Sequence, residues 1–249
     1  MKTQRIIAAI VGLALPLLVG QTQAAEIKVL ASTAVKTTLE ELGPQYEKAT
    51  GNKVDIAYGP ATILKTKIDQ GTAFDVAILT APVADGLAGE GKIDTTRTTI
   101  AHSGIGVAIH KGAPKLDVST TEAFKRALLN AKSVGFTAAG ASGVYLKTLF
   151  EKLGIADELK PKLKLLQGPA GEAAASGEVE IGMTQISEIL PYANAELAGP
   201  LPADVQTYTY FSAAASTITK EADVAKAFIK FLTAPAALAV IKAKGMEPG

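Results

Sequence analysis

The chain has 249 residues, with 25 basic and 24 acidic side chains, a formal net charge of +1, no Cys and no Trp. This balance offers no basic surface for nucleic acid, and aromatic residues, at 5% of the chain, offer few platforms for stacking bases. Without Cys the protein has no disulfide framework, no thiol chemistry and no thiolate metal site.

The first 25 residues have the pattern of a secretory signal peptide. Lys2 and Arg5 form a short positive region, residues 6–20 are apolar apart from Gly and Pro, and Ala24 and Ala25 offer a cleavage site. This apolar run is shorter than the roughly 20 residues that a membrane-spanning helix needs. We therefore expect export to the periplasm, followed by folding of about 225 residues as one large domain or two modest lobes.

Strand and helix patterns alternate along the first part of the mature chain. Strands are predicted at residues 26–31, 54–57 and 75–79, and each is followed by a helix pattern. The first helix pattern, with apolar residues from Val35 to Tyr46, contains Gly43-Pro44, where we expect an interruption. Such alternation is typical of βαβ units around a parallel sheet, so the sequence predicts an α/β protein.

Two long apolar stretches, residues 100–109 and 206–215, predict strands that leave the first lobe and return to it. If they are crossings, lobe 1 comprises residues 26–102 plus 210–249 and lobe 2 comprises residues 103–209, with a hinge of two segments and a cleft between the lobes. The remaining predicted elements are strands at 133–136, 163–166 and 179–184 and helices at 119–128, 142–153, 169–176, 220–232 and 235–243.

Hydroxyl-bearing turns follow a predicted strand in each half, at Ser32-Thr33 and at Ser142-Gly143. A helix start has backbone N–H groups without intrahelical partners and the positive end of the helix dipole, so it can bind an anion. The chain has only three Arg residues, although Arg is the usual side chain for gripping carboxylates and phosphates. The sequence therefore predicts an anion site built from amides and hydroxyls, although Ser32 and Thr33 also fit ordinary helix caps.

Several stretches of the chain together resemble type II periplasmic solute-binding proteins, and in particular their molybdate-binding branch. Besides the strand–Ser–Thr–helix opening, these are YEKATGNKVDI, ILKTKIDQGTAFDVAILTA, ASGVYLKTLFEKLGI and GEVEIGMTQISEI. The resemblance implies two α/β lobes with the ligand cleft between them, a molybdate-like oxyanion or small carboxylate as ligand, and the membrane permease of an ABC importer as partner. We expect a monomer without a cofactor.

The resemblance also implies ligand-binding residues in both lobes. The family's first Ser falls on Ser32, beside Thr33, and its serine-rich turn falls on residues 59–62, where only Thr62 keeps a hydroxyl. Its second-lobe helix start falls on residues 141–145, which implies roles for Ser142, Gly143 and Tyr145, and its ligand-facing Tyr falls on Gln185. Gln185 offers both a donor and an acceptor, which suits a carboxylic acid better than an all-acceptor oxyanion.

Plainer roles stay open for some of these residues. Thr62 belongs to a Gly-Pro turn, and the backbone preferences of Gly and Pro are enough to explain that turn without a ligand. Gln167, before Gly168-Pro169, fits a simple turn residue. Tyr145 fits ordinary packing along the helix stripe of Leu149 and Leu153.

Stretches around Ser142 and Gln185 are also similar to bacterial aconitate isomerases, which leaves an enzyme as the alternative. That alternative implies an isomerase that moves an allylic double bond, with Glu188, a carboxylate three residues after Gln185, or His102 as the base. A structural role suits His102 better than a catalytic one. The chain has no metal-binding motif, so we expect no metal site.

Overall fold

The computed structural model describes residues 24–249, so most of the predicted signal peptide lies outside the described part of the chain. The first lobe is built on β1 (Glu26–Ser32), which pairs in parallel with β2 (Lys53–Gly59) and β3 (Val76–Thr80). Next to β3, β9 (Tyr208–Ala215) runs antiparallel. The strand alternation of β1 sends Ile27 and Val29 to one face of the sheet and Leu30 to the other.

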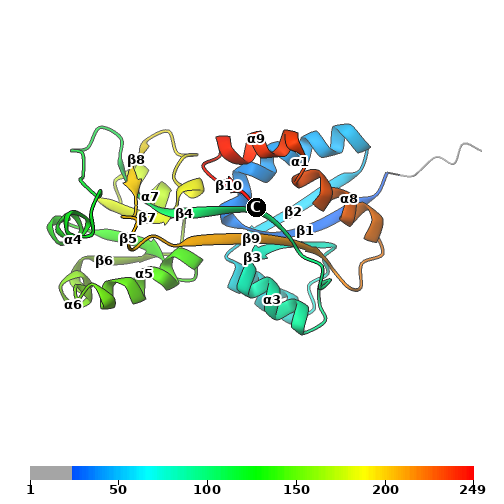
Figure 1. The fold of residues 1–249 in the computed structure, drawn as a ribbon, viewed down its shortest axis with the longest axis horizontal. Coiled ribbons are helices and arrows are strands. Elements are labelled where there is room, and N and C mark those ends of the chain that lie inside the picture. The colour runs from blue at the N-terminus through cyan, green and yellow to red at the C-terminus, as the bar shows by residue number, and fades with distance from the viewer. Residues whose placement is uncertain (1–23) are drawn as a thin grey trace, which may run out of the picture.

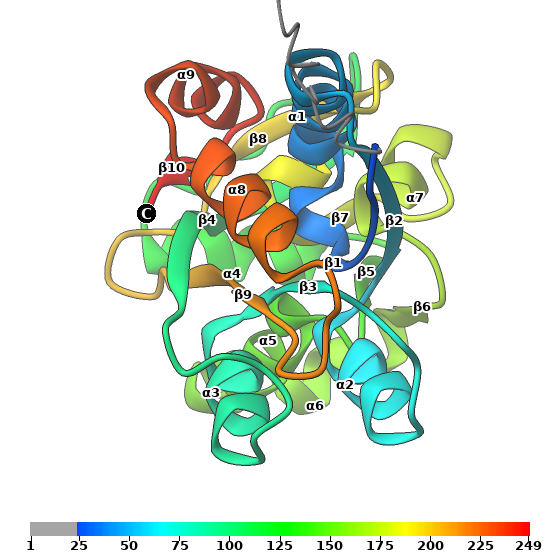
Figure 2. The ribbon, with the colours of Figure 1, turned by 90° about the vertical axis from the view of Figure 1, so that its right-hand side faces the viewer.

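Helices cover both faces of this sheet (Figure 2). On the face of Ile27 and Val29 lie α1 (Lys36–Thr50), which follows the short helix η1 (Thr33–Val35), and the two last helices of the chain, α8 (Ala222–Leu232) and α9 (Pro235–Ala243). On the face of Leu30 lie α2 (Ala61–Asp69) and α3 (Ala81–Gly89). The first lobe is therefore a three-layer sandwich with one apolar cluster on each side of its sheet.

The second lobe repeats this arrangement. β5 (Val134–Thr137) pairs in parallel with β6 (Leu163–Leu166) and β7 (Ile181–Gln185). One face packs on α4 (Thr121–Asn130), α5 (Ala141–Lys152) and α6 (Ala156–Leu159), the other on α7 (Ala170–Ser176). The short helix η2 (Lys160–Lys162) leads into β6, and η3 (Ile186–Glu188) follows β7.

A single long strand, β4 (Thr98–His110), runs through both lobes (Figure 1). Residues 98–104 pair with β9, and residues 105–110 pair with β7 and β8 (Ala195–Pro200). The sheet order is β2-β1-β3-β9-β4-β7-β5-β6, and β8 and the C-terminal β10 (Glu247–Pro248) also pair with β4. The predicted α/β fold with two lobes and a hinge of two segments is thus confirmed.

Some local predictions were wrong. α1 continues through Pro44 to Thr50, because Leu39, Leu42 and Tyr46 hold one apolar face of the helix against the core. α4 begins at Thr121, two residues later than predicted, where the Thr120 hydroxyl accepts a hydrogen bond from the N–H of Ala123. β8, β10 and α6 were not predicted, since all three are short and have no clear hydrophobic period.

Within residues 24–249 no single helix is long and apolar enough to cross a bilayer. Taken together, α8 and α9 are long and apolar enough for a membrane span, but they are bent by 61° at the break between them. Their apolar residues include Phe228, Leu232 and Ile241, which are buried against the first sheet. This burial accounts for the hydropathy of the pair.

Phe228 tests the contribution of this layer to stability. Its side chain is fully buried and meets the Tyr46 ring edge-on, with 5.0 Å between ring centroids. We expect Phe228→Ala to lower the free energy of unfolding by about 3–5 kcal/mol, because it leaves a cavity between helix and sheet. Chemical denaturation of the purified protein measures this loss. Ile218→Ala, at a side chain that is 83% exposed, is the control and should change stability by less than about 0.5 kcal/mol.

Candidate ligand-binding site

A pocket of about 170 Å³ lies between the lobes, where strands from both lobes end. A ligand that fits a pocket of this volume is small. The first lobe contributes Ser32, Thr33, Ala34, Pro60, Ala61, Thr80 and Phe211 to the lining. The second lobe contributes Thr137, residues 140–142, residues 167–169, Thr184, Gln185 and Glu188. The predicted site residues Ser32, Thr33, Ser142 and Gln185 therefore share one cavity.

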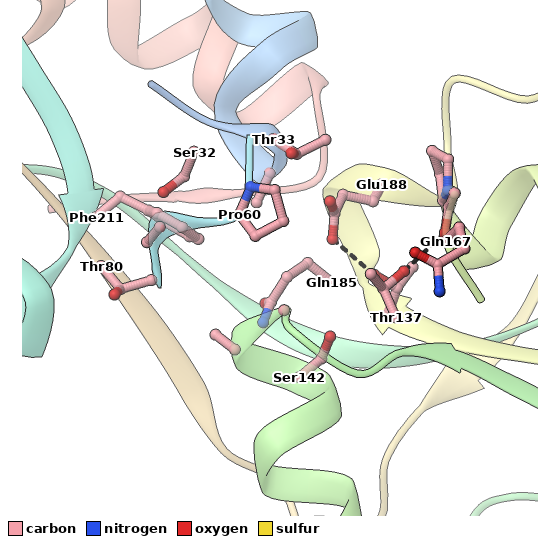
Figure 3. Close-up of a pocket in the computed structure, with 17 residues that line it drawn as sticks. Ser32, Thr33, Pro60, Thr80, Thr137, Ser142, Gln167, Gln185, Glu188 and Phe211 are labelled. Carbon is pink, nitrogen blue, oxygen red and sulfur yellow. Dashed lines mark hydrogen bonds between the residues drawn. The ribbon is translucent and has the colours of Figure 1, made fainter. Parts of the chain in front are cut away.

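Ser32 and Ser142 enter this pocket from opposite sides (Figure 3). Ser32 ends β1 and precedes η1, and Ser142 lies in the first turn of α5. Ser32 is only 3% exposed, and its Oγ has no hydrogen-bond partner within the described residues. Its hydroxyl makes no capping bond to the helix that follows, which removes the plainer interpretation as a cap. A buried hydroxyl without a protein partner needs another partner, and for Ser32, which lines the pocket, a ligand or a water in the pocket can supply it.

Several helices begin at the wall of the pocket without a side-chain cap. Their N-cap positions, Ser32, Pro60, Thr80, Gly140 and Pro169, all line the cavity, and none makes a side-chain capping bond. The lack of a side-chain cap is not confined to the pocket, because α8 and α9 lack one as well, and what distinguishes these helix starts is their convergence on one cavity. Helix starts that converge on the cavity leave backbone N–H groups available to a bound anion.

Gln185 stands at the end of β7 and is 2% exposed. Its Nε2 donates a hydrogen bond to Thr209 Oγ1 on β9 at 2.8 Å, and its Oε1 is buried without a partner in the described chain. The side chain thus connects the second lobe to the return strand, and its oxygen is left with unused hydrogen-bonding capacity.

Glu188, on η3, is the only ionisable side chain among the residues that line the pocket. The Thr184 hydroxyl donates to its Oε2 at 2.6 Å. Burial raises the pKa of the Glu188 carboxyl, against the smaller opposing effects of the Thr184 hydroxyl and the Gln185 backbone. No Lys, Arg or His belongs to the lining, so this carboxyl has no cationic partner in the pocket.

Other residues predicted for the site lie outside the lining. The hydroxyl of Thr62 donates to the carbonyl oxygen of Ala139 at 3.2 Å, which connects α2 of the first lobe to the second lobe. Gly143 permits close packing, since a Cβ there would lie 2.2 Å from the carbonyl oxygen of Thr137. Tyr145 donates from its hydroxyl to the carbonyl oxygen of Val205 at 2.8 Å. All three shape the walls of the cleft without lining the cavity.

His102, the other candidate base, lies on β4 away from the pocket. Its ring stacks on Tyr210 at 4.8 Å between centroids and meets Tyr208 edge-on at 5.6 Å. This packing fits the structural role expected for it. Residues 24–249 hold no group of three or more His, Asp or Glu side chains arranged to bind a metal ion.

Sequence reasoning missed several lining residues. Thr80 and Thr137 end β3 and β5, so the strand-end rule that selected Ser32 would also have selected them. Gln167, interpreted as a turn residue, lines the pocket, as does Thr184. No sequence pattern around Phe211 marks it as a site residue. It reaches the pocket only because β9, from the C-terminal part of the chain, pairs with β3 of the first lobe.

Solved structures with the same architecture define the class of this fold. The Azotobacter vinelandii periplasmic molybdate-binding protein matches with a TM-score of 0.78 at 22% identity, over 90% of this chain and 99% of that one. The sulfate-binding protein SubI of Mycobacterium tuberculosis matches with a TM-score of 0.73 at 15% identity, over 90% of this chain and 87% of that one. The protein therefore has the fold of type II periplasmic binding proteins.

Sequence comparisons give the family. The chain is 31% identical over 241 residues to a Pseudomonas protein named aconitate isomerase, covering 94% of this chain and 91% of that one. It is 28% identical over 259 residues to the molybdate-binding protein ModA of Azotobacter vinelandii, covering 95% of each. The model of the bacterial extracellular solute-binding protein family matches residues 27–247. The chain belongs to this family of bacterial extracellular solute-binding proteins.

The Thr62–Ala139 hydrogen bond predicts a role in holding the lobes together. Thr62→Val should weaken the closed arrangement by about 0.5–1.5 kcal/mol, the net worth of one hydrogen bond. Small-angle X-ray scattering should then report a larger radius of gyration. Thr66→Val is the matched control, because the Thr66 hydroxyl bonds only to the Thr62 carbonyl oxygen within the same helix. Equal scattering from the two variants would contradict this role.

Proposed function

We propose that the protein captures a small anion between its two lobes, as the periplasmic, monomeric binding component of an ABC importer. The observation that carries this proposal is the arrangement of uncharged donors: Ser32 and Ser142 enter one pocket from opposite lobes, among helix starts that lack side-chain caps. Such a site needs neither metal nor arginine. The family of the chain and the ligands named for its molybdate- and sulfate-binding relatives support the same function.

Binding follows from the hinge between the lobes. Ser32 and Thr33 belong to the first lobe, whereas Ser142 and Gln185 belong to the second, so only the closed arrangement offers all of these donors at once. A ligand that bonds to both sets shifts the population toward closure by its difference in affinity for the two arrangements. We place the division at residues 26–102 plus 210–249 and 103–209, next to the point where β4 changes its pairing from β9 to β7.

A second candidate function is isomerisation of aconitate in the same pocket. It is favoured by the position of Glu188 and by the relative named aconitate isomerase. Glu188 would take a proton from the methylene carbon of the tricarboxylate while the double bond shifts by one carbon. The proton then returns to the former vinylic carbon, so atoms and electrons balance without a co-reactant. A raised pKa suits this proton transfer, because a base works best when its pKa lies near the working pH.

Ser32→Ala tests the anion site. A thermal-shift screen of molybdate, sulfate, phosphate and small carboxylates selects the ligand, since a hundredfold excess over Kd adds about 2.7 kcal/mol of stability. Ser32→Ala should then weaken the affinity for that ligand by about 1.5–3 kcal/mol, because one hydrogen bond to a charged group is lost. Isothermal titration calorimetry measures the change.

Ser187→Ala is the matched control for this substitution. Ser187 Oγ is also buried without a partner in the described chain, but Ser187 does not line the pocket. The control should fold normally and bind with wild-type affinity. If both variants bind like the wild type, Ser32 does not contact the ligand.

A turnover assay separates the two candidate functions. For a binding protein, we expect the ultraviolet absorbance of trans-aconitate to stay constant during incubation with the purified protein. A progressive change that yields cis-aconitate, absent from a sample with heat-denatured protein, would establish the isomerase in place of the binding protein.

A further inference from the structure

Glu188 is an unusual neighbour for a captured anion. It is the only ionisable side chain lining a pocket of about 170 Å³, so a ligand that fills this volume lies close to the carboxyl. The carboxyl is fixed in place, since Thr184 donates to its Oε2 at 2.6 Å from the preceding strand β7 (Figure 3). A negatively charged ligand and an ionised Glu188 would therefore repel one another at short range.

The surroundings of Glu188 do not neutralise it. Every other residue that lines the pocket is uncharged. These residues come from both lobes and include Thr80 on β3, Thr137 on β5, Phe211 on β9 and the turn at residues 167–169. Outside the lining, the charges of Glu172 on α7 and of Glu188 both raise the pKa of the Tyr192 phenol, after the larger effect of burial. No lining residue supplies a cation next to Glu188, so a proton is the simplest relief for a repulsion between its carboxylate and a bound anion.

We propose that Glu188 and the bound ligand share one proton, so that the pocket selects a small carboxylic acid over a fully ionised tetrahedral oxyanion. The proposal rests on the proposed capture of an anion and specifies its chemical class. A carboxyl and a carboxylate that face each other can hold one proton between them, just as paired carboxylates in a protein titrate as one unit. Gln185 Oε1, buried in the lining without a partner in the described chain, is a further acceptor for a proton-bearing ligand.

Binding must then be coupled to proton uptake. The ordinary carboxyls of a small acid are ionised near pH 7, so one proton enters the complex for each ligand bound whenever free Glu188 is ionised as well. The affinity should fall by up to tenfold per pH unit in that range. Molybdate is doubly charged at neutral pH, so we expect the Glu188 carboxyl to weaken its binding more than that of a carboxylic acid that arrives beside it through one carboxyl group.

Isothermal titration of the mature chain with trans-aconitate, in buffers of different ionisation enthalpy between pH 6 and 8.5, measures this proton uptake. We expect the wild type to take up close to one proton per ligand above the pKa of free Glu188. Glu188→Gln keeps the shape of the side chain and supplies an amide donor, so it should abolish the uptake, flatten the dependence of affinity on pH and strengthen molybdate binding. Glu172→Gln, outside the pocket, is the matched control and should keep the wild-type uptake.

Different results overturn different claims. Binding of trans-aconitate without proton uptake, or with the same uptake in Glu188→Gln, would overturn the shared proton and leave anion capture intact. Failure of both trans-aconitate and molybdate to bind would overturn the anion capture and the ligand class together.

A measurement without ligand checks the protonation of Glu188 separately. Because the folded protein holds this proton more tightly than the unfolded chain, the wild type should lose stability as pH rises from the ordinary Glu pKa through the raised value. Glu188→Gln should lack this loss in thermal unfolding curves recorded from pH 4.5 to 8. Equal pH dependence in the two proteins would show that free Glu188 ionises normally. Full proton uptake should then already be seen at pH 6, and its absence there would overturn the shared proton.

Discussion

The antiparallel pairing of β4 with β9 is the constraint on which the site depends. β4 is shared, since residues 98–104 belong to the sheet of the first lobe and residues 105–110 to that of the second. Through this strand the carboxyl ends of β1 and β3 are brought opposite those of β5 and β7. Parallel strands followed by helices place helix starts at those ends, so two ordinary α/β lobes joined in this way enclose a cavity between their helix N-termini.

This origin accounts for the proposed binding of an anion without a cationic side chain. A guanidinium or ammonium group would occupy much of a cavity of about 170 Å³ and would need partners of its own when the ligand leaves. Backbone N–H groups occupy no additional volume, and their dipoles are fixed by the helices behind them. Hydroxyls such as those of Ser32 and Ser142 add donors of adjustable direction.

The fold and the centre of the site could be predicted from sequence because both depend on local patterns. A strand ending in Ser or Thr before a helix marks Ser32, and the resemblance to binding proteins marks Ser142 and Gln185. Thr62 and Tyr145 could not be assigned in this way, since the partners of their hydroxyls, Ala139 and Val205, are more than fifty residues away in the chain. Phe211 reaches the pocket only through the sheet order, which no local pattern reveals.

Glu188 shows how little separates a binding protein from an isomerase on this scaffold. A transport protein needs a cavity that closes around its ligand, excludes water and opens again, and an isomerase needs the same cavity with one group that accepts and returns a proton. The pocket already contains a carboxyl with a raised pKa and a fixed hydrogen bond from Thr184. Whether that carboxyl only shares a proton or also transfers one depends on the distance between its oxygens and an acidic carbon of the ligand, because general-base catalysis requires hydrogen-bond reach. The two proposed functions therefore differ in where the ligand lies relative to Glu188, and both use the same lobes, hinge and helix starts.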